Sequence, residues 1–341
     1  MNTNFFRGRL LPLLLVLVIF LVWKLRQDHQ KGKWISLVGE TMGTTYNIKY
    51  NHDKGSNYQV SIDSLLKVFN QSLSTYIPDS EISQFNRDSI FYFESPFFPK
   101  VLQRARQIHQ QTQGTFNPAV MPLVNAWGFG PQQNPLPDST EVDSILQLTD
   151  FRSIVFDDTK VTKLNHNSQL DFSAIAKGYG VDIVADFLRN RGITHLFVEI
   201  GGEVVAQGKN DQQQIWTVGI NAPHPSSDLE SIQVVIRLDD RALATSGNYR
   251  NFYIKDGKKY VHTINPETGY PIEQSLLSAS VFADDCITAD AIATAFMVMC
   301  LDRAKKFLED NPRLEAYLIY SQGNGKLLTF FTEGMKEYIV Q

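Results

Sequence analysis

The chain has 341 residues, of which 43% are apolar and 20% are charged, and its formal net charge is -4. This length and composition are those of an ordinary globular protein that can bury a large core in one domain or two. The acidic balance argues against a general nucleic-acid binder, because no strongly basic face is implied.

The N-terminal residues read as a targeting segment with a linker. Residues 10–23 are apolar apart from one proline, and basic residues flank them on both sides. Such a run approaches the ~20 residues that span a bilayer, but it is also as long as the core of a signal peptide. Because no small-x-small cleavage site follows, we expect an uncleaved anchor and linker over residues 1–33 and one folded domain over residues 34–341.

The first half of the domain is predicted to contain two clear helices. Helical spacing of apolar residues predicts helices at 61–72 and 100–112, with Ser61 and Asp63 as capping residues of the first and Gly114 as the stop of the second. Strands are expected at 35–38 and 46–50, and a hairpin that turns at 157–158 is expected within 150–170.

The second half is predicted to be richer in strands. A helix at 175–190, closed by Gly192, leads into a strand at 195–200, and another helix is expected at 285–300. Further strands are expected at 216–220, 232–238, 251–254, 260–264 and 278–282 and as a pair around 323–325. The small residues of 244–249 predict a loop. Because strands outnumber helices and adjoin in hairpins, we predict an α+β fold of mixed, largely antiparallel sheets flanked by helices.

The two cysteines limit the redox and metal chemistry of the chain. Cys286 and Cys300 lie on the last of these predicted helices, too far apart to form a disulfide. A disulfide framework and a cysteine-rich metal site are therefore both excluded.

His262 occupies a position that favours chemistry. It lies in a predicted strand, and the turn-forming residues of 265–269 follow closely. A histidine can take up a proton at neutral pH, so this position suggests a general base. Taken alone, however, the pattern is explained better by a structural or surface histidine.

Three other segments offer oxygen ligands or contacts to anions. Asp290 and Thr294 lie four residues apart on one helix face and suit Mg²⁺, although helix capping is a competing interpretation. Asp171 lies near the start of a helix, where free backbone N–H groups can bind a phosphate, or else it simply caps that helix. The paired glycines of 199–203 either turn the chain or let a ligand approach the backbone.

Together these segments resemble the ApbE family of FAD:protein FMN transferases in order and spacing. The matching motifs are Met42 to Tyr46, Ser74 to Tyr76 with Ser80 to Asn86, Gly114 to Pro118, Asp171 to Gly180, Glu199 to Glu203, Thr245 to Tyr249, His262 to Pro271 and Ala289 to Thr294. The resemblance implies an ApbE-like fold. It also implies an enzyme that transfers FMN from FAD to a Thr or Ser hydroxyl of an acceptor flavoprotein subunit, releases AMP and depends on Mg²⁺.

The resemblance further implies roles for single residues. His262 is the base that activates the acceptor hydroxyl, and the metal ligands are Asp290, Thr294 and the backbone carbonyl of Ala174. The FAD-contacting positions are Met42, Tyr76, Asn117, Pro118, Ala119, Asp171, Lys177 and Ile264. Cleavage of a diphosphate needs a cation to neutralise developing charge and a base for the incoming hydroxyl, and these residues supply candidates for both.

The implied location is the periplasmic side of the inner membrane, where the anchor holds the domain and subunits of membrane redox complexes serve as acceptors. No nucleic-acid partner is expected. Two alternatives use the same residues. One is a Mg²⁺-dependent FAD diphosphatase that gives FMN and AMP, and the other is a protein that binds FAD without cleaving it.

Overall fold

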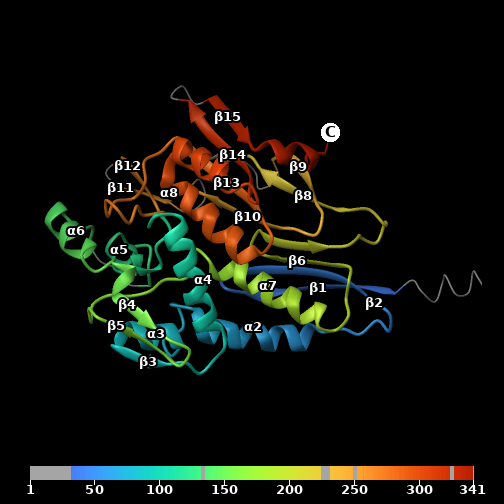
Figure 1. Cartoon of the computed structure of the whole chain (residues 1–341), viewed down its shortest axis with the longest axis horizontal. Helices are drawn as coiled ribbons and strands as arrows, with labels where there is room; N and C mark the ends of the chain where they lie inside the picture. The colour runs from blue at the N-terminus through green and yellow to red at the C-terminus, as the bar shows by residue number, and fades with distance from the viewer. Residues whose placement is uncertain are drawn as a thin grey trace, which may run out of the picture.

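A computed structural model describes residues 32–131, 135–223, 231–248, 252–255, 257–322 and 326–340. An eight-stranded sheet runs through its centre in the order β1-β2-β6-β7-β10-β13-β14-β15 (Figure 1). The strands are β1 (Lys33–Thr41), β2 (Thr44–His52), β6 (Leu196–Ile200), β7 (Glu203–Gln207), β10 (Ala242–Gly247), β13 (Leu276–Ala283), β14 (Glu315–Gln322) and β15 (Lys326–Phe331). Every strand pair within the described ranges is antiparallel.

Four helices lie on one side of this sheet. They are α2 (Gln59–Leu73), α4 (Phe97–Gln111), α7 (Ala176–Arg189) and α8 (Cys286–Asp310). The helix α8 packs on β10 and β13, α7 packs on β6 and β7, and the two helices pack against each other (Figure 1). This arrangement places the starts of α7 and α8 side by side over the centre of the sheet.

The opposite face of the sheet is covered by a hairpin of β8 (Trp216–Asn221) and β9 (Ile232–Leu238). Side chains alternate between the two faces of a strand, so neighbouring residues of β7 pack into the hydrophobic clusters on opposite faces of the sheet. Val204 joins the cluster that contains Trp216 and Ile236, whereas Val205 joins the cluster under α7. The sheet is therefore buried on both faces where the helices and the hairpin overlap it.

Smaller units surround the central sheet. They are α3 (Glu81–Arg87), α5 (Met121–Ala126), α6 (Ser139–Leu146), the 3-10 helices η1 (Pro118–Val120), η2 (Phe151–Ser153) and η3 (Glu333–Glu337), the sheet of β3 (Ile90–Tyr92), β5 (Lys160–Lys163) and β4 (Ile154–Phe156), and the hairpin of β11 (Phe252–Lys255) and β12 (Lys258–Val261). The β3-β5-β4 sheet lies at the lower left in Figure 1, apart from the main sheet.

The predicted α+β class and antiparallel sheets are confirmed, but several local predictions are wrong. Residues 242–247 form the strand β10 rather than a loop, and its small side chains let α8 pack closely on it. The helix α2 begins at Gln59, whose N–H donates to Asn57 at 2.8 Å, so Ser61 and Asp63 do not cap it. The helix predicted at 285–300 is confirmed as the first part of α8, which continues beyond a kink at Cys300 to Asp310.

The two cysteines are both free, as predicted. The predicted anchor falls outside the described residues, which begin at Gly32. In the part of the chain that the structure describes, no helix combines the length and the apolar character needed to cross a membrane.

Candidate active site

A cavity of about 470 Å³ opens where the ends of several elements meet. Its walls come from the segment before α5, the start of α7, the β6–β7 turn, the end of β8, the strand β10, the residues after β12 and one face of α8. Its volume is in the range of small-molecule binding pockets. Nine of the twelve candidate residues line it, namely Asn117, Pro118, Asp171, Ala174, Lys177, His262, Ile264, Asp290 and Thr294.

The other three candidates lie outside the lining of this cavity. Met42 has a left-handed backbone with φ 52°, and its terminal methyl group lies against Gly180 of α7. Tyr76 is 68% exposed, and its partial burial together with the charge of Asp171 raises its pKa. Ala119 is fully buried, and its N–H donates to Asn117 Oδ1 at 2.9 Å. Ala119 therefore helps to hold Asn117 in the cavity wall.

A glycine brings Asp290 to the start of α7. A Cβ atom on Gly178 would lie 2.2 Å from the carbonyl oxygen of Cys286 and 2.7 Å from the Cβ of Asp290, so only glycine allows this approach. The N–H of Gly178 donates to Asp290 Oδ2 at 2.8 Å. Gly178 lies in the first turn of α7, where backbone N–H groups have no acceptor within the helix, so Asp290 supplies one. Ala174, whose carbonyl is a candidate metal ligand, comes before the helix.

Lys177 is held between two carboxylates. Its Nζ lies 2.5 Å from Glu203 Oε1, and Glu203 is only 1% exposed. Burial works to lower the pKa of Lys177, but the charges of Glu203 and Asp290 outweigh it and raise that pKa. Burial also raises the pKa of Asp290, against the effects of Lys177 and the Gly178 amide. Lys177 therefore keeps its positive charge inside the cavity.

Asp171 does not cap α7, contrary to one interpretation of the sequence. The residue before the helix is Ile175, which makes no side-chain cap, and Asp171 instead accepts hydrogen bonds from the N–H and the hydroxyl of Ser173 at 2.8 and 2.5 Å. Its own N–H donates to the carbonyl of Pro118 at 2.8 Å. Burial raises the pKa of Asp171, and the bonds from Ser173 oppose this rise.

Thr294 faces the cavity from α8 and pairs with a strand of the sheet. Its hydroxyl lies 2.9 Å from the hydroxyl of Ser246 on β10. The helix α8 is capped by Asp285, which accepts from the N–H of Thr288 at 3.0 Å, so Asp290 is not the capping residue. Asp290 and Thr294 both line the cavity, as expected for residues four apart on one helix face.

His262 comes directly after β12, which ends at Val261. The following turn is closed by the N–H of Asn265, which donates to the carbonyl of Tyr270 at 2.8 Å. The ring of Phe129 lies edge-on to His262, with 6.5 Å between the ring centroids. The imidazole is therefore held at the rim of the cavity between a closed turn and an aromatic ring.

Sequence reasoning missed several residues of the cavity. Glu203 lies in the motif of residues 199–203, whose glycines were expected either to turn the chain or to let a ligand approach, yet the carboxylate of Glu203 itself forms an ion pair with Lys177. The signal was present, because a charged residue follows the paired glycines at the start of a buried strand. Ser246 was assigned to a loop. Residues 219–221, at the end of β8, also line the cavity, but no sequence motif indicated that they would.

Carboxylates, a lysine and a histidine that converge on one cavity define the chain as an enzyme of the α+β class. The chain belongs to the ApbE family, because the model of that family matches residues 42–318. The predicted membership of the ApbE family and the predicted flavin transferase class are therefore confirmed.

Similar proteins cover most of the chain. The FAD:protein FMN transferase of Vibrio cholerae is 39% identical over 294 residues, which are 83% of this chain and 86% of that protein. The FAD:protein FMN transferase of Haemophilus influenzae is 36% identical over 327 residues, which are 91% of this chain and 93% of that protein. Among solved structures, the flavin transferase ApbE from Vibrio cholerae matches with a TM-score of 0.82 and 36% identity over 90% of this chain and 99% of that one.

Proposed function

We propose that this chain transfers the FMN part of FAD to a Thr or Ser hydroxyl of an acceptor protein and releases AMP. The observation that carries the proposal is the convergence of His262, Lys177 and Asp290 on one cavity. The name of the relatives, FAD:protein FMN transferase, supplies the donor and the kind of acceptor. In the reaction, the acceptor oxygen forms a bond to the phosphorus of the FMN half. The bond from that phosphorus to the bridging oxygen breaks, and AMP leaves with that oxygen.

His262 takes the proton of the acceptor hydroxyl as the oxygen attacks. A general base of this kind typically contributes about 10²- to 10⁴-fold to the rate. The closed turn after His262 fixes the position of its backbone, so the imidazole needs little reordering when an acceptor arrives. Lys177, held by Glu203, supplies a fixed positive charge to the diphosphate. Such a charge stabilises the transition state because it does not have to reorganise during the reaction.

The residues of the cavity fit Mg²⁺. The Asp290 carboxylate, the Thr294 hydroxyl and the Ala174 carbonyl would hold it, and all three offer the oxygen ligands that Mg²⁺ prefers. Asp290 is 3% exposed and burial raises its pKa, while the buried Glu203 Oε2 has no hydrogen-bond partner in the described structure, so a bound cation would stabilise the ionised forms of these carboxyl groups. When bound, Mg²⁺ neutralises charge on the diphosphate. Within the described ranges, no cluster of three His, Cys, Asp or Glu side chains offers another metal site.

The proposal includes a location and a partner. The apolar run of residues 10–23 supports an N-terminal anchor in the inner membrane, with the domain on the periplasmic side. An acceptor there is a subunit of a membrane redox complex that carries the modified Thr or Ser.

One experiment separates transfer from its alternatives. The purified full chain is incubated with FAD, Mg²⁺ and the membrane fraction of cells that lack this chain. Transfer predicts a protein that gains the mass of FMN and fluoresces as a covalent flavin in a denaturing gel, together with an equal amount of AMP. Production of AMP without a mass gain points to a diphosphatase, and FAD binding with neither product points to a binding protein.

A further inference from the structure

A second cavity, of about 780 Å³, lies beside the first. Its lining comes from the end of α4, from residues 146–155 and from the turn after His262. Asn117 and Pro266 line both cavities. Pro266 belongs to the turn that follows His262, and His262 itself lines the first cavity.

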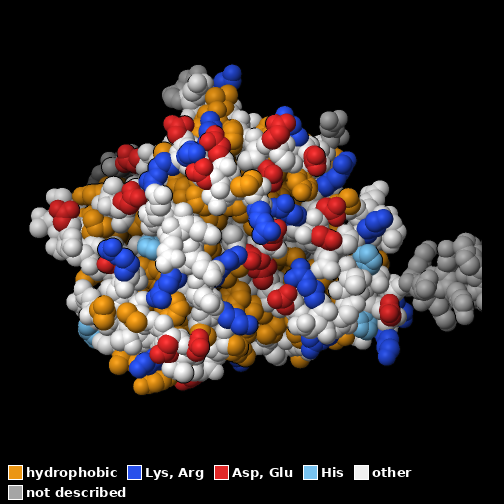
Figure 2. Space-filling view, viewed as in Figure 1, with side chains coloured by type: hydrophobic (Ala, Val, Ile, Leu, Met, Phe, Trp, Pro, Cys, Tyr) orange, Lys and Arg blue, Asp and Glu red, His pale blue; other side chains and the backbone are white. Residues whose placement is uncertain are grey.

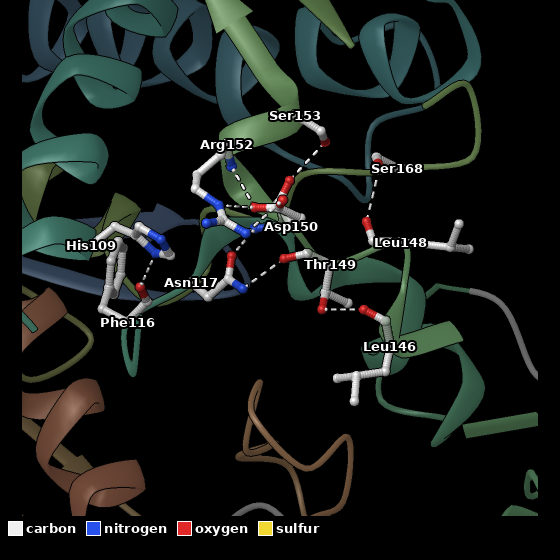
Figure 3. Close-up of polar contacts among 11 residues, drawn as sticks. His109, Phe116, Asn117, Leu146, Leu148, Thr149, Asp150, Arg152, Ser153 and Ser168 are labelled. Carbon is white, nitrogen blue, oxygen red and sulfur yellow. Dashed lines mark hydrogen bonds and ion pairs between the residues drawn. The ribbon is translucent and has the colours of Figure 1, made fainter. Parts of the chain in front are cut away.

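The polar groups around the second cavity are largely bonded to one another (Figure 3). The side-chain amide of Asn117 donates to the carbonyl of Thr149 at 2.8 Å, and His109 Nδ1 donates to the carbonyl of Phe116 at 2.8 Å. Asp150 pairs with Arg152 at 2.9 Å, while the Arg152 side chain stays 85% exposed. The hydrogen bonds of Asn117 and His109 therefore hold the walls of the cavity in place. The exposed side chain of Arg152 can contact a partner without breaking a buried hydrogen bond.

An exposed apolar surface adjoins this cavity. Ile90 and Val155 both pair with Thr162 in the β3-β5-β4 sheet, so their side chains lie on the same face, together with that of Tyr92 two residues along. These three side chains are 49%, 49% and 65% exposed, in the order Ile90, Val155 and Tyr92. Val155 also lines the second cavity. In Figure 2, orange side chains are visible over the lower left of the molecule, where Figure 1 places this sheet.

We propose that the second cavity and the exposed residues Ile90, Tyr92 and Val155 form the docking face for the acceptor protein. This inference rests on the proposed function. With FAD in the first cavity, the acceptor hydroxyl has to arrive from outside that cavity. A segment in the second cavity would lie beside it, because Asn117 and Pro266 line both cavities and His262 lines the first. Exposed apolar side chains next to a polar, preformed hollow have the composition of a protein interface, and large apolar residues are seldom grouped on a free surface.

The first test changes the docking face and measures transfer. Val155→Glu and Tyr92→Glu each place a charge on the exposed sheet face, and Val38→Glu, on the 66% exposed Val38 of β1, is the matched control. Each full chain is given FAD, Mg²⁺ and dilute membranes from cells that lack the chain. We expect about tenfold slower flavin labelling for the two docking variants, which corresponds to about 1.4 kcal/mol of binding. We expect less than twofold change for Val38→Glu and unchanged FAD affinity in all three.

The second test locates the acceptor directly. A photo-crosslinking amino acid is placed at Tyr92 or at Val38 in the full chain, and cells are irradiated. The docking face predicts a cross-linked product from position 92 that carries covalent flavin fluorescence, and none from position 38. Equal labelling rates for Val155→Glu and the wild type, or a flavin-labelled product from position 38 alone, would overturn the docking face. A wild-type chain that labels no protein would instead overturn the proposed function, and the docking face with it.

Discussion

Lys177, Glu203 and Asp290 show how charge balance decides what the cavity can hold. Burial raises the pKa of Glu203 to about 8 and also raises the pKa of Asp290, and the charge of Lys177 opposes both rises. A further cation in the cavity would favour the ionised form of both carboxyl groups in the same way. The pairing of Asp290 with Thr294 could be predicted, because helical spacing puts residues four apart on one face. The pairing of Lys177 with Glu203 could not, because it joins residues from two elements whose contact depends on the whole sheet.

Replacing His262 by alanine tests the base. We expect transfer to fall by about 10²- to 10⁴-fold, because the acceptor hydroxyl then loses its proton to water. FAD affinity, measured by quenching of flavin fluorescence, should change by less than about threefold. The base assignment is wrong if FAD affinity falls as steeply as the transfer rate does.

Replacing Asp290 by asparagine tests the metal site. Asparagine can still accept the hydrogen bond from Gly178, but it removes the negative charge that would hold Mg²⁺. We expect the Mg²⁺ concentration for half-maximal activity to rise at least tenfold, and the stabilisation of the folded chain by Mg²⁺ in thermal melts to disappear. A variant that responds to Mg²⁺ like the wild type would show that the metal binds elsewhere.

The junction between α7 and α8 positions the site, and it illustrates the limits of sequence reasoning about elements. Both helices could be predicted from their apolar spacing, and the structure confirms them. The strand β10 beneath α8 could not, because its small residues, which permit close helix packing, also resemble a loop. The helix α6 was not predicted, although the capping box of Asp138 and Glu141 at its start is visible in the sequence.

Gly178→Ala tests the closeness of this junction. The new Cβ would collide with the backbone of Cys286, which cannot move cheaply, so we expect a loss of about 1 to 3 kcal/mol in unfolding free energy. Activity should fall by at least tenfold because Asp290 is displaced. Gly180→Ala is the control on the same helix, since its Cβ meets the flexible terminal methyl group of Met42. Equal stabilities of the two variants in urea denaturation would contradict a tight contact at Gly178.

Asp182 links α7 to the start of α8, and its raised pKa predicts that the stability of the fold depends on pH. Its carboxylate accepts the N–H groups of Cys286 and Ile287 at 2.9 and 2.8 Å, and burial raises its pKa from 3.8 to about 7. Between these values the folded chain holds a proton that the unfolded chain has lost, so stability falls as the pH rises through this window. We expect the stability advantage of the wild type over Asp182→Asn to shrink by roughly 3 kcal/mol from pH 4 to pH 7. Urea denaturation at several pH values measures this difference in stability. A difference that stays constant or grows with pH would contradict the raised pKa of Asp182.

The whole molecule assembles its cavity from segments spread between residues 115 and 298. Motifs within single segments could be recognised in the sequence, but their convergence depends on the antiparallel order of the central sheet, which no local pattern encodes. The β8–β9 hairpin illustrates this, because its end reaches the cavity only after it packs on the second face of the sheet. The first strand of this sheet, β1, begins at Lys33, directly after the predicted anchor and close to the predicted domain boundary.

Removing residues 1–31 therefore tests both the domain boundary and the anchor. The shortened chain keeps β1 and the hydrogen bond from Asn51 to the carbonyl of Gly32, so we expect its melting temperature and FAD affinity to match those of the full chain. The full chain should stay in the membrane pellet after an alkaline wash, and the shortened chain should be soluble. Leu15→Arg, which keeps the length but places a charge in the apolar run at a cost of about 3 kcal/mol, should weaken membrane retention without affecting the domain. Unfolding of the shortened chain would refute the boundary, and release of the full chain by the wash would refute the anchor.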